Sequence, residues 1–217
     1  MKKLIISIIT LFTVVLQNYP AMAAEVTPVN QSDYIQAVIE ANLMNNFPDG
    51  NFYEEMLITR GELAEILVKT FALDKRQINK TKKDIFIADV PVNYWAYQDI
   101  QTVLKTGVMK GYRDSMFFPN QRITKAEGLA IFAQAYGVFQ FPSKTVYEIL
   151  SSYPDANNIP QWARKGIATI IAEDFIKTDS QGNIKPLEPM TRADIAYVLS
   201  RYLLRRQQYP QMPLLSS

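Results

Sequence analysis

The sequence predicts an all-α fold built from three repeated units. The first observation is a four-residue phrase that occurs three times and begins at Thr59, Thr124 and Thr191. The second is that apolar residues around each phrase recur at helical spacing, with no convincing run of alternating strand pattern. Two helices cannot bury their apolar faces alone, so we expect three helix-loop-helix units that share a core.

The units align with one another without gaps. A shift of 67 residues places Trp95 on Trp162, and a shift of 65 residues places Asp114 on Asp49. Helical periodicity alone would match apolar positions, and it does not explain matching Trp and Asp positions. The sequence therefore predicts a tandem repeat, with units at residues 30–72, 85–138 and 152–205.

Each unit is expected to hold two helices. In the second unit, the apolar side chains from Tyr94 to Thr106 predict the first helix, and Thr124 begins the next. In the third unit, the second helix is predicted from about Arg192 to Leu204, at one-face spacing.

The connectors between units differ in composition. Leu73 to Asp84 is polar and basic, which favours a solvated linker over a binding patch. In the second connector, Ser143 is a candidate cap for a short helix that ends at Leu150. Residues 206–217 include two prolines and no periodic pattern, and they are expected to form a disordered tail.

Composition excludes several classes of function. The 217 residues contain no cysteine and no histidine, which excludes disulfides, cysteine-based metal sites and every histidine-dependent mechanism. The formal charge is +2, and it falls to zero without Lys2 and Lys3. The remaining chain has no electrostatic reason to bind nucleic acid. We expect no metal, no cofactor and no nucleic-acid partner.

Residues 1–24 have the pattern of an export signal. Lys2 and Lys3 precede an uncharged run of thirteen residues from Leu4 to Leu16, and Ala21-Met22-Ala23 fits the small-x-small cleavage rule. Such a run spans about 20 Å as a helix, which is short of the ~30 Å hydrocarbon core, so a signal peptide is favoured over a membrane anchor. We expect an exported protein of the cell envelope, in the periplasm or at the cell wall, with no integral membrane segment in the mature chain.

The repeated phrase is a capping box, which is Thr-x-x-Glu ahead of an apolar helical run. The threonine hydroxyl accepts from the N–H three residues on, and the acidic side chain accepts from the threonine N–H. Two of the four orphan donors at a helix start are thereby satisfied. In the third unit the shorter Asp194 is expected to close the box less well. The capping pairs are Thr59 with Glu62, Thr124 with Glu127, and Thr191 with Asp194.

A basic residue follows each threonine, at Arg60, Lys125 and Arg192. A cation beside the positive end of a helix dipole is mildly unfavourable, and a repeated local misfit indicates function. Bare N–H groups at a helix start, with a cation beside them, would form a site for a carboxylate or phosphate. The alternatives are a solvent-exposed side chain and a salt bridge to a neighbouring unit.

The order of elements in the second unit is distinctive. Ile87-Ala88-Asp89-Val90 precedes Tyr94-Trp95-Ala96, then comes the loop from Gly107 to Asp114, and then Ile123-Thr124-Lys125-Ala126-Glu127. This order, found three times, resembles the S-layer homology repeat. The resemblance implies a pseudo-threefold helical prism that binds bacterial cell-wall polysaccharide non-covalently. The ligand of that family is typically a secondary wall polymer that carries ketal pyruvate.

The resemblance places candidate ligand-binding residues on this chain. The basic residue of the motif falls on Arg60, Lys125 and Arg192, its Trp on Trp95 and Trp162, and its loop Gly on Gly111, while Tyr112 and Asp114 share that loop. Tryptophan at these positions is a candidate for stacking on sugar, although aromatic residues at helical spacing are more often core. Tyr112 and Phe47 are better candidates for exposed aromatic residues.

The units depart from the family pattern. Asn30 stands where the first unit would have its Trp, and Thr178-Asp179 replaces Gly111-Tyr112 in the third unit. Lys125 is a point charge without the planar fork of arginine, so its pairing with a carboxylate is less directional. We therefore expect three unequal grooves, of which one or two bind well.

The favoured function is binding of cell-wall polysaccharide, as a stand-alone anchor or as an adaptor that holds a separate envelope protein. The alternative is a periplasmic or extracellular helical scaffold for protein interaction that has lost glycan binding. Cations clustered in open grooves favour the first function, and cations in inter-unit salt bridges favour the second. No enzyme activity is expected. Glu54 with Glu55, or Asp155 with Glu173, would supply two carboxylates for a glycosidase, but nothing in the sequence positions them.

Overall fold

The computed structural model describes residues 30–77 and 81–210. Within these residues the regular secondary structure is helical, apart from isolated β-bridges, and the predicted all-α class is confirmed. The predicted export signal at residues 1–24 lies outside the described residues. In the part of the chain that the structure describes, no helix has the length and apolar character needed to cross a membrane.

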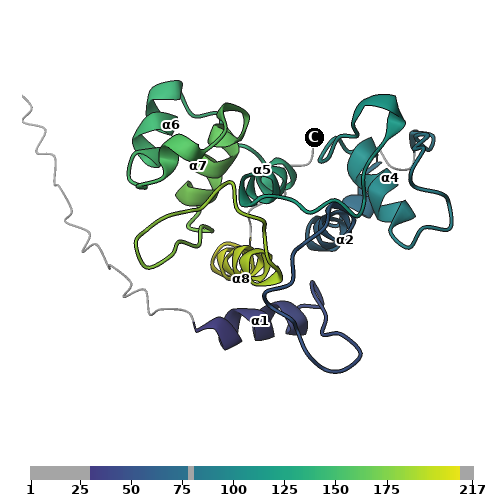
Figure 1. Cartoon of the computed structure of the whole chain (residues 1–217), viewed down its shortest axis with the longest axis horizontal. Coiled ribbons are helices and arrows are strands. Elements are labelled where there is room, and N and C mark those ends of the chain that lie inside the picture. Colours follow the sequence, from purple (N-terminus) through teal and green to yellow (C-terminus); the bar gives the residue numbers. More distant parts are fainter. Residues whose placement is uncertain (1–29, 78–80, 211–217) are drawn as a thin grey trace, which may run out of the picture.

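Three inner helices begin at the repeated phrase and three outer helices surround them. The inner helices are α2 (Arg60–Phe71), α5 (Lys125–Tyr136) and α8 (Arg192–Gln208), which Figure 1 shows nearly end-on around the centre. The outer helices are α1 (Gln31–Glu40), α4 (Tyr97–Lys105) and α7 (Arg164–Ala172), and α6 (Ser143–Leu150) lies beyond α7. Short 3-10 turns complete the described elements at η1 (Leu73–Lys75), η2 (Arg113–Ser115), η3 (Ala156–Asn158) and η4 (Gln161–Ala163).

The outer helix of each unit packs on an inner helix of another unit. Helix α4 packs on α2, α7 packs on α5, and α1 closes the circle by packing on α8. Each of the three lobes in Figure 1 therefore combines two sequence units. A single unit has no partner for its apolar faces, which is why the fold needs all three.

A closed ring of backbone hydrogen bonds joins the residues just before the three capping boxes. The Ile58 N–H donates to the Met190 carbonyl at 2.9 Å, the Met190 N–H donates to the Ile123 carbonyl at 2.8 Å, and the Ile123 N–H donates to the Ile58 carbonyl at 3.3 Å. All three side chains are buried. The ring fixes the starting points of the inner helices relative to one another.

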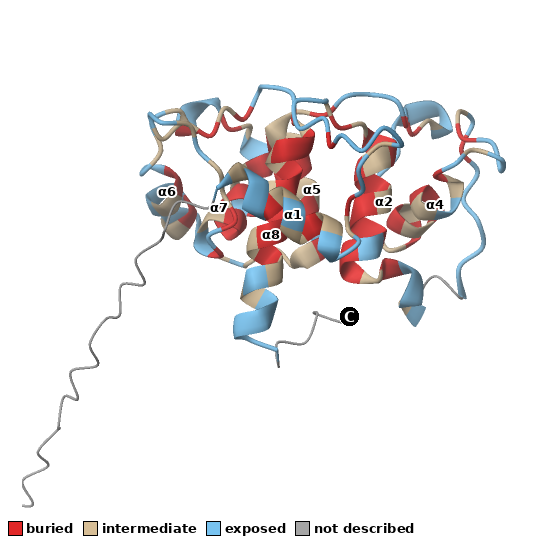
Figure 2. Ribbon diagram, turned by 90° about the horizontal axis from the view of Figure 1, so that it is seen from below, coloured by how far each residue is buried: buried red, intermediate tan, exposed pale blue. Residues whose placement is uncertain are grey.

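The core fills the space between the inner helices. Figure 2 shows that the faces of α2, α5 and α8 that meet are buried, whereas the far end of α8 is exposed. Phe71, Phe132 and Tyr202 come from one inner helix each, and their ring centroids lie between 5.1 and 6.1 Å apart. Aromatic pairs of this geometry contribute about 0.5–1.5 kcal/mol each beyond their buried area.

Several predicted boundaries were wrong. Helix α4 begins at Tyr97, not at Tyr94, so Trp95 lies in the turn that precedes it. Helix α8 continues to Gln208, beyond the expected end at Leu204, and residues 206–208 are therefore helical and not a disordered tail. Helix α6 has the expected bounds, but Pro142 occupies the cap position and Ser143 makes no capping bond.

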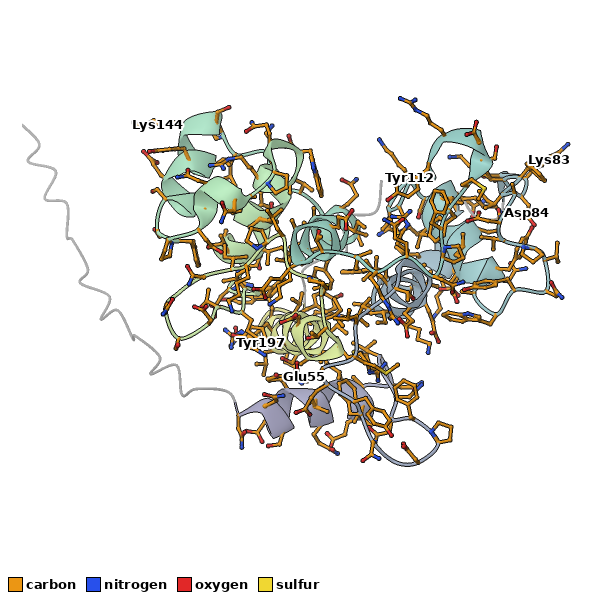
Figure 3. The ribbon with its side chains drawn as sticks, in the orientation of Figure 1. Glu55, Lys83, Asp84, Tyr112, Lys144 and Tyr197 are labelled. Carbon is orange, nitrogen blue, oxygen red and sulfur yellow. The ribbon has the colours of Figure 1, made fainter. Side chains whose placement is uncertain are left out.

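The basic connector after α2 is attached to the second unit. Lys82 donates to the Lys105 carbonyl at 3.0 Å, and Asp84 pairs with the Lys105 ammonium at 2.6 Å. In Figure 3 Asp84 and its neighbour Lys83 lie together at the outer edge of the α4 lobe. The predicted solvated linker is thus exposed along much of its described length, but two side chains hold it to the end of α4.

Gly128 offers a test of how tightly the core is packed. A Cβ atom placed on Gly128 would lie 2.2 Å from the sulfur of the buried Met190. We expect Gly128→Val to lower the free energy of unfolding by about 1–3 kcal/mol, because a packed core has no space for the added carbons. Urea denaturation followed by circular dichroism measures the change. In a double variant with Met190→Ala the loss should be smaller than the sum of the two single losses, and additive losses would contradict the explanation.

Candidate functional site

All three capping boxes are formed. The threonine N–H donates to the carboxylate at 2.8 Å for Glu62, 2.8 Å for Glu127 and 3.0 Å for Asp194. The threonine hydroxyls accept the return bonds at 3.1–3.2 Å. The expectation that Asp194 closes its box less well was wrong, since both reciprocal bonds are present in the third unit.

The predicted bare N–H groups are not bare. The N–H groups of Arg60 and Gly61 donate to the carbonyls of Gln121 and Pro119 at 3.0 and 2.8 Å. The first two N–H groups of α5 and of α8 donate to loop carbonyls in the same way, from Lys125, Ala126, Arg192 and Ala193. With the third N–H bound to the threonine hydroxyl, the helix starts themselves present no free donors to an anion.

Arg60 is held inside its lobe and is only 6% exposed. Its Nε donates to the Phe117 carbonyl at 2.8 Å, and its Nη2 donates to the Lys110 carbonyl at 2.9 Å. The guanidinium also lies 4.7 Å from the ring centroid of Tyr112 and 4.6 Å from that of Phe117. These contacts fix a cation against the loop that follows α4.

Arg192 repeats this arrangement in the lobe of α8 and α1, where it is 8% exposed. Its Nε donates to the Phe52 carbonyl at 2.8 Å, and its Nη2 donates to the Asn45 carbonyl at 2.7 Å. The rings of Phe47 and Phe52 lie 4.9 and 4.4 Å from the guanidinium. Two inner helices therefore use one device to hold an arginine.

The positive charge of both arginines is only partly compensated. Burial lowers the pKa of both guanidiniums, while nearby charges oppose this shift, with Tyr112, Glu127 and Asp89 acting on Arg60 and Glu62 acting on Arg192. Arginine stays protonated in spite of such a shift. The ion pairs found within the described residues involve neither arginine. A desolvated cation without an ion-pair partner favours an anionic ligand that can reach it.

Lys125 behaves differently from the two arginines. Its Nζ lies 3.4 Å from Oδ1 of Asp194, and the two side chains are 20% and 13% exposed. The pair joins the second unit to the third. This is the inter-unit salt bridge that the scaffold alternative expects, and it occupies the cation that one of the three predicted sites depends on.

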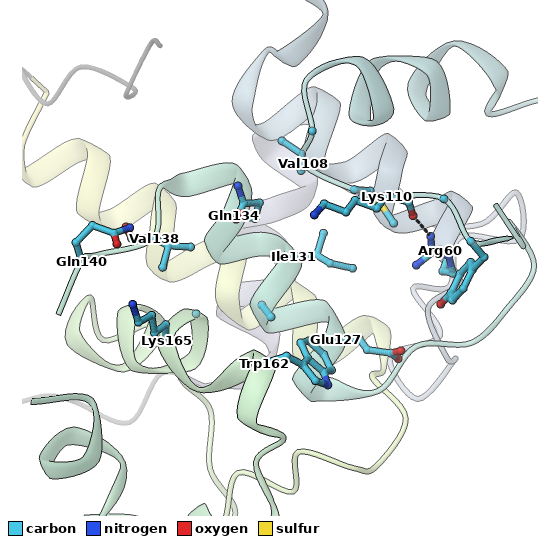
Figure 4. A pocket seen from close by; sticks show the side chains of 16 residues that line it. Arg60, Val108, Lys110, Glu127, Ile131, Gln134, Val138, Gln140, Trp162 and Lys165 are labelled. Carbon is cyan, nitrogen blue, oxygen red and sulfur yellow. Dashed lines mark hydrogen bonds between the residues drawn. The ribbon is translucent and has the colours of Figure 1, made fainter. Parts of the chain in front are cut away.

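A cavity of about 600 Å³ brings most of the predicted site residues together (Figure 4). It lies between the loop after α4, the exposed face of α5 and the turn η4. We call it the Arg60 cavity. Its lining includes Arg60 of the first unit, Gly111, Tyr112 and Glu127 of the second, and Trp162 of the third, together with Lys110 and Lys165.

Tyr112 and Asp114 diverge although they share a loop. Tyr112 lies on the side of its lobe that faces α5 (Figure 3) and lines the Arg60 cavity. Asp114 is exposed in η2, with a φ of 57°, and it does not line this cavity. Gly111 is placed tightly, since a Cβ there would lie 3.1 Å from the Met116 carbonyl. The structure thus brings Tyr112 and Gly111 to the other predicted residues and leaves Asp114 apart.

A smaller cavity of about 320 Å³ repeats the arrangement one unit earlier. We call it the Arg192 cavity, and its lining includes Arg192, Phe47, Glu62 and Trp95. Trp95 and Trp162 are 58% and 63% exposed, so the interpretation that they belong to the core was wrong. Both precede the regular part of an outer helix, and the helical period of the sequence had included them in it.

Charge distinguishes the two cavities. The Arg60 cavity is lined by three cations, Arg60, Lys110 and Lys165, and by one carboxylate, Glu127. The Arg192 cavity is lined by two cations and two carboxylates, and its Lys69 and Glu65 already pair at 2.7 Å. Because unpaired charge attracts a counter-ion over several ångströms, an anionic ligand is favoured in the Arg60 cavity.

Two aspartates position the loops of the site, a role that sequence reasoning missed. Asp89 accepts from the N–H groups of Phe117 and Phe118 at 2.8 and 2.7 Å. Asp155 accepts from Ile184 and Lys185 at 3.0 and 2.6 Å. The signal was a shift of 66 between the two aspartates, which a gapless shift of 67 does not detect.

These bonds also bear on the suggested glycosidase pair. Both oxygens of Asp155 accept backbone bonds. Glu173 is buried and accepts from Arg205 Nε at 2.9 Å. Each carboxylate is thus engaged in structure, and the two do not form a paired catalytic site.

Comparison with known proteins matches this geometry to a family. A family model for the S-layer homology domain matches residues 25–64, 87–127 and 152–196, which together exceed half of the chain. The surface-layer 125 kDa protein of Lysinibacillus sphaericus is 26% identical over 189 residues, covering 83% of this chain and 15% of that protein. A cellulosome-anchoring protein of Acetivibrio thermocellus is 27% identical over 168 residues, covering 76% of this chain and 36% of that protein.

An enzyme is also among the relatives. An amylopullulanase of Thermoanaerobacterium thermosulfurigenes is 20% identical over 168 residues, which cover 77% of this chain and 9% of the enzyme. The chain spans well under half the length of each of these relatives. The shared part is therefore the repeat region.

The bonds of Arg60 predict that this residue stabilises the fold. We expect Arg60→Gln to lower the free energy of unfolding by about 1–3 kcal/mol, because buried carbonyls of Phe117 and Lys110 lose their donor. Chemical denaturation measures the effect. Lys110→Gln, at an exposed position in the same cavity, should change stability by less than about 0.5 kcal/mol. Equal stability of the two variants would show that the arginine bonds are not structural.

Proposed function

Because the chain belongs to the S-layer homology domain family, we propose that it is a non-covalent anchor that binds an anionic cell-wall polysaccharide in the Arg60 cavity. The observation that carries this proposal is the net positive lining of a cavity of about 600 Å³ with an exposed Trp162 at its edge. Relatives named as surface-layer and anchoring proteins support an exported protein of the cell envelope. We place the protein at the wall, where such a polymer is found.

The cavity suggests how a carboxylate on the polymer would bind. Arg60 supplies a fixed cation, since two carbonyls and two rings hold its guanidinium in place. The recorded bonds use Nε and Nη2, so Nη1 is the donor assigned to the ligand. Lys110 and Lys165 are exposed and adjust their positions to the remaining charge. Charge-assisted hydrogen bonds of this kind contribute roughly 1.5–3 kcal/mol each.

Trp162 contributes an apolar surface beside these charges. Its large ring is 63% exposed at the edge of the cavity, and a sugar ring presents an apolar face of C–H groups. Stacking on Trp162 would orient the sugar so that its acidic substituent faces Arg60. Charge and stacking together select an anionic glycan over a neutral glycan or a simple anion.

The scaffold alternative is supported by one observation, the Lys125–Asp194 pair. This pair neutralises one cation, and it does not affect Lys110 or Lys165, which remain exposed in the Arg60 cavity. Wall binding is therefore the better explanation of the molecule as a whole. A separate envelope protein as cargo, and the absence of catalysis, belong to the same proposal.

Co-sedimentation of the purified protein with bacterial wall sacculi tests the proposal. We expect wild type to pellet with sacculi, and less so after the pyruvate is stripped from the polymer. The double variant Lys110→Gln/Lys165→Gln should lower the affinity about tenfold, which corresponds to about 1.4 kcal/mol. Because both side chains are exposed, the variant keeps the fold, and its melting temperature serves as a check.

Matched variants in the Arg192 cavity provide the control. Lys69→Gln and Trp95→Ala change the same kinds of side chain, and they should weaken sedimentation less than Lys165→Gln and Trp162→Ala do. Loss of binding in the Trp95 variant alone would assign the ligand to the Arg192 cavity. No sedimentation of wild type with any sacculi would overturn the wall-anchor proposal.

The third position yields a separate prediction. Because Asp194 already neutralises Lys125, we expect Lys125→Gln to leave the affinity for sacculi within about twofold of wild type, less than one charge-assisted bond would produce. The same sedimentation assay measures it. A tenfold loss in this variant would mean that the ligand displaces Asp194 and that the third groove binds.

A further inference from the structure

A second hollow adjoins the Arg60 cavity. It has a volume of about 390 Å³ and lies between α6, η4 and the start of α7. Its lining includes Val146 and Tyr147 from α6, Gln161 from η4, and Arg164 from α7. Trp162 and Lys165 line this hollow and also the Arg60 cavity. We call it the Tyr147 cavity, and the shared side chains make the two cavities neighbours.

The chemistry of the Tyr147 cavity is that of a saccharide site. Tyr147 is 67% exposed and Trp162 is 63% exposed, so two large aromatic side chains on different elements remain in solvent beside one hollow. Such rings carry an apolar face and a polar edge, which suits the C–H face and hydroxyl groups of a sugar. Gln161 adds an amide, and Arg164 is oriented by its bond to the Ala156 carbonyl at 3.1 Å.

We propose that the Arg60 and Tyr147 cavities form one continuous groove, in which α6 supplies a second subsite for an anionic oligosaccharide. The first sugar, with its acidic substituent, occupies the Arg60 cavity, and the next sugar lies against Tyr147. Trp162 and Lys165 stand at the junction of the two subsites. This inference rests on the function proposed above and adds to it a preference for a ligand of at least two sugar residues.

Only one of the two binding cavities can be extended in this way. The corresponding connector after the first unit, residues 73–84, contains no aromatic residue. The Arg192 cavity, with Trp95 at its edge, therefore has no counterpart of Tyr147. Length preference is expected of the Arg60 groove alone, which is also the groove with the larger positive charge.

Titration calorimetry with two synthetic ligands tests the subsite. One ligand is a methyl glycoside with a ketal pyruvate, and the other is a tetrasaccharide with the same group on its terminal sugar. We expect wild type to bind the tetrasaccharide about 3- to 10-fold more tightly, and Tyr147→Ala to remove this advantage, as expected for one aromatic contact. The affinity of Tyr147→Ala for the monosaccharide should equal that of wild type.

Glu148→Ala is the matched control, because Glu148 follows Tyr147 on α6 and lines neither cavity. Lys144, its surface partner, stands at the outer edge of the helix (Figure 3). If Glu148→Ala weakens tetrasaccharide binding as much as Tyr147→Ala does, the Tyr147 subsite is overturned.

The two levels of the proposal fail in different ways. If wild type binds both ligands with equal affinity, or if Tyr147→Ala binds the tetrasaccharide as wild type does, the second subsite is wrong and the Arg60 site stands. If wild type binds neither ligand and no sacculi, the proposed function itself is wrong.

Discussion

The closed ring of hydrogen bonds through Ile58, Ile123 and Met190 is the constraint on which the rest of the structure depends. Each of these residues directly precedes a capping box, so the ring decides where the three inner helices start. It also brings the loop of each unit against the helix start of another, where loop carbonyls accept the first helical N–H groups. Because the bonds run in a circle, loss of one unit would leave a buried donor and a buried acceptor unpaired in the other two.

The site is a consequence of this closure. Arg60 begins α2 but bonds to the loop after α4, and Arg192 begins α8 but bonds to the loop after α1. Such a cation is a cross-brace between units and, at the same time, the charged wall of a cavity. Stability and ligand binding therefore share the same side chains, and replacing the arginines confuses the two. The exposed lysines of the Arg60 cavity separate them, since they bear charge without bracing the fold.

What could be predicted from the sequence was local. The helix starts and the capping boxes follow from neighbouring residues, and the all-α class follows from periodicity, so these predictions were confirmed. The partners of Arg60 are backbone carbonyls 50 and 57 residues away, which no spacing rule encodes. The packing of α1 on α8 is equally non-local. Trp162 was misjudged because a turn that precedes a helix has the same short-range pattern as the helix itself.

The third groove shows how two small changes close a site. At this position Lys replaces Arg and Asp replaces Glu, and the two changes meet in one ion pair. Lysine lacks the planar fork that holds Arg60 to two carbonyls, so its ammonium is free to take a carboxylate instead. Asp194 serves both roles, because its Oδ2 accepts from the Thr191 N–H while its Oδ1 faces Lys125. The cation and the acid thus satisfy each other, whereas the other grooves leave an arginine with no carboxylate bound to it. A pseudo-threefold frame can therefore keep its packing at all three positions while it reserves charge for a ligand at fewer.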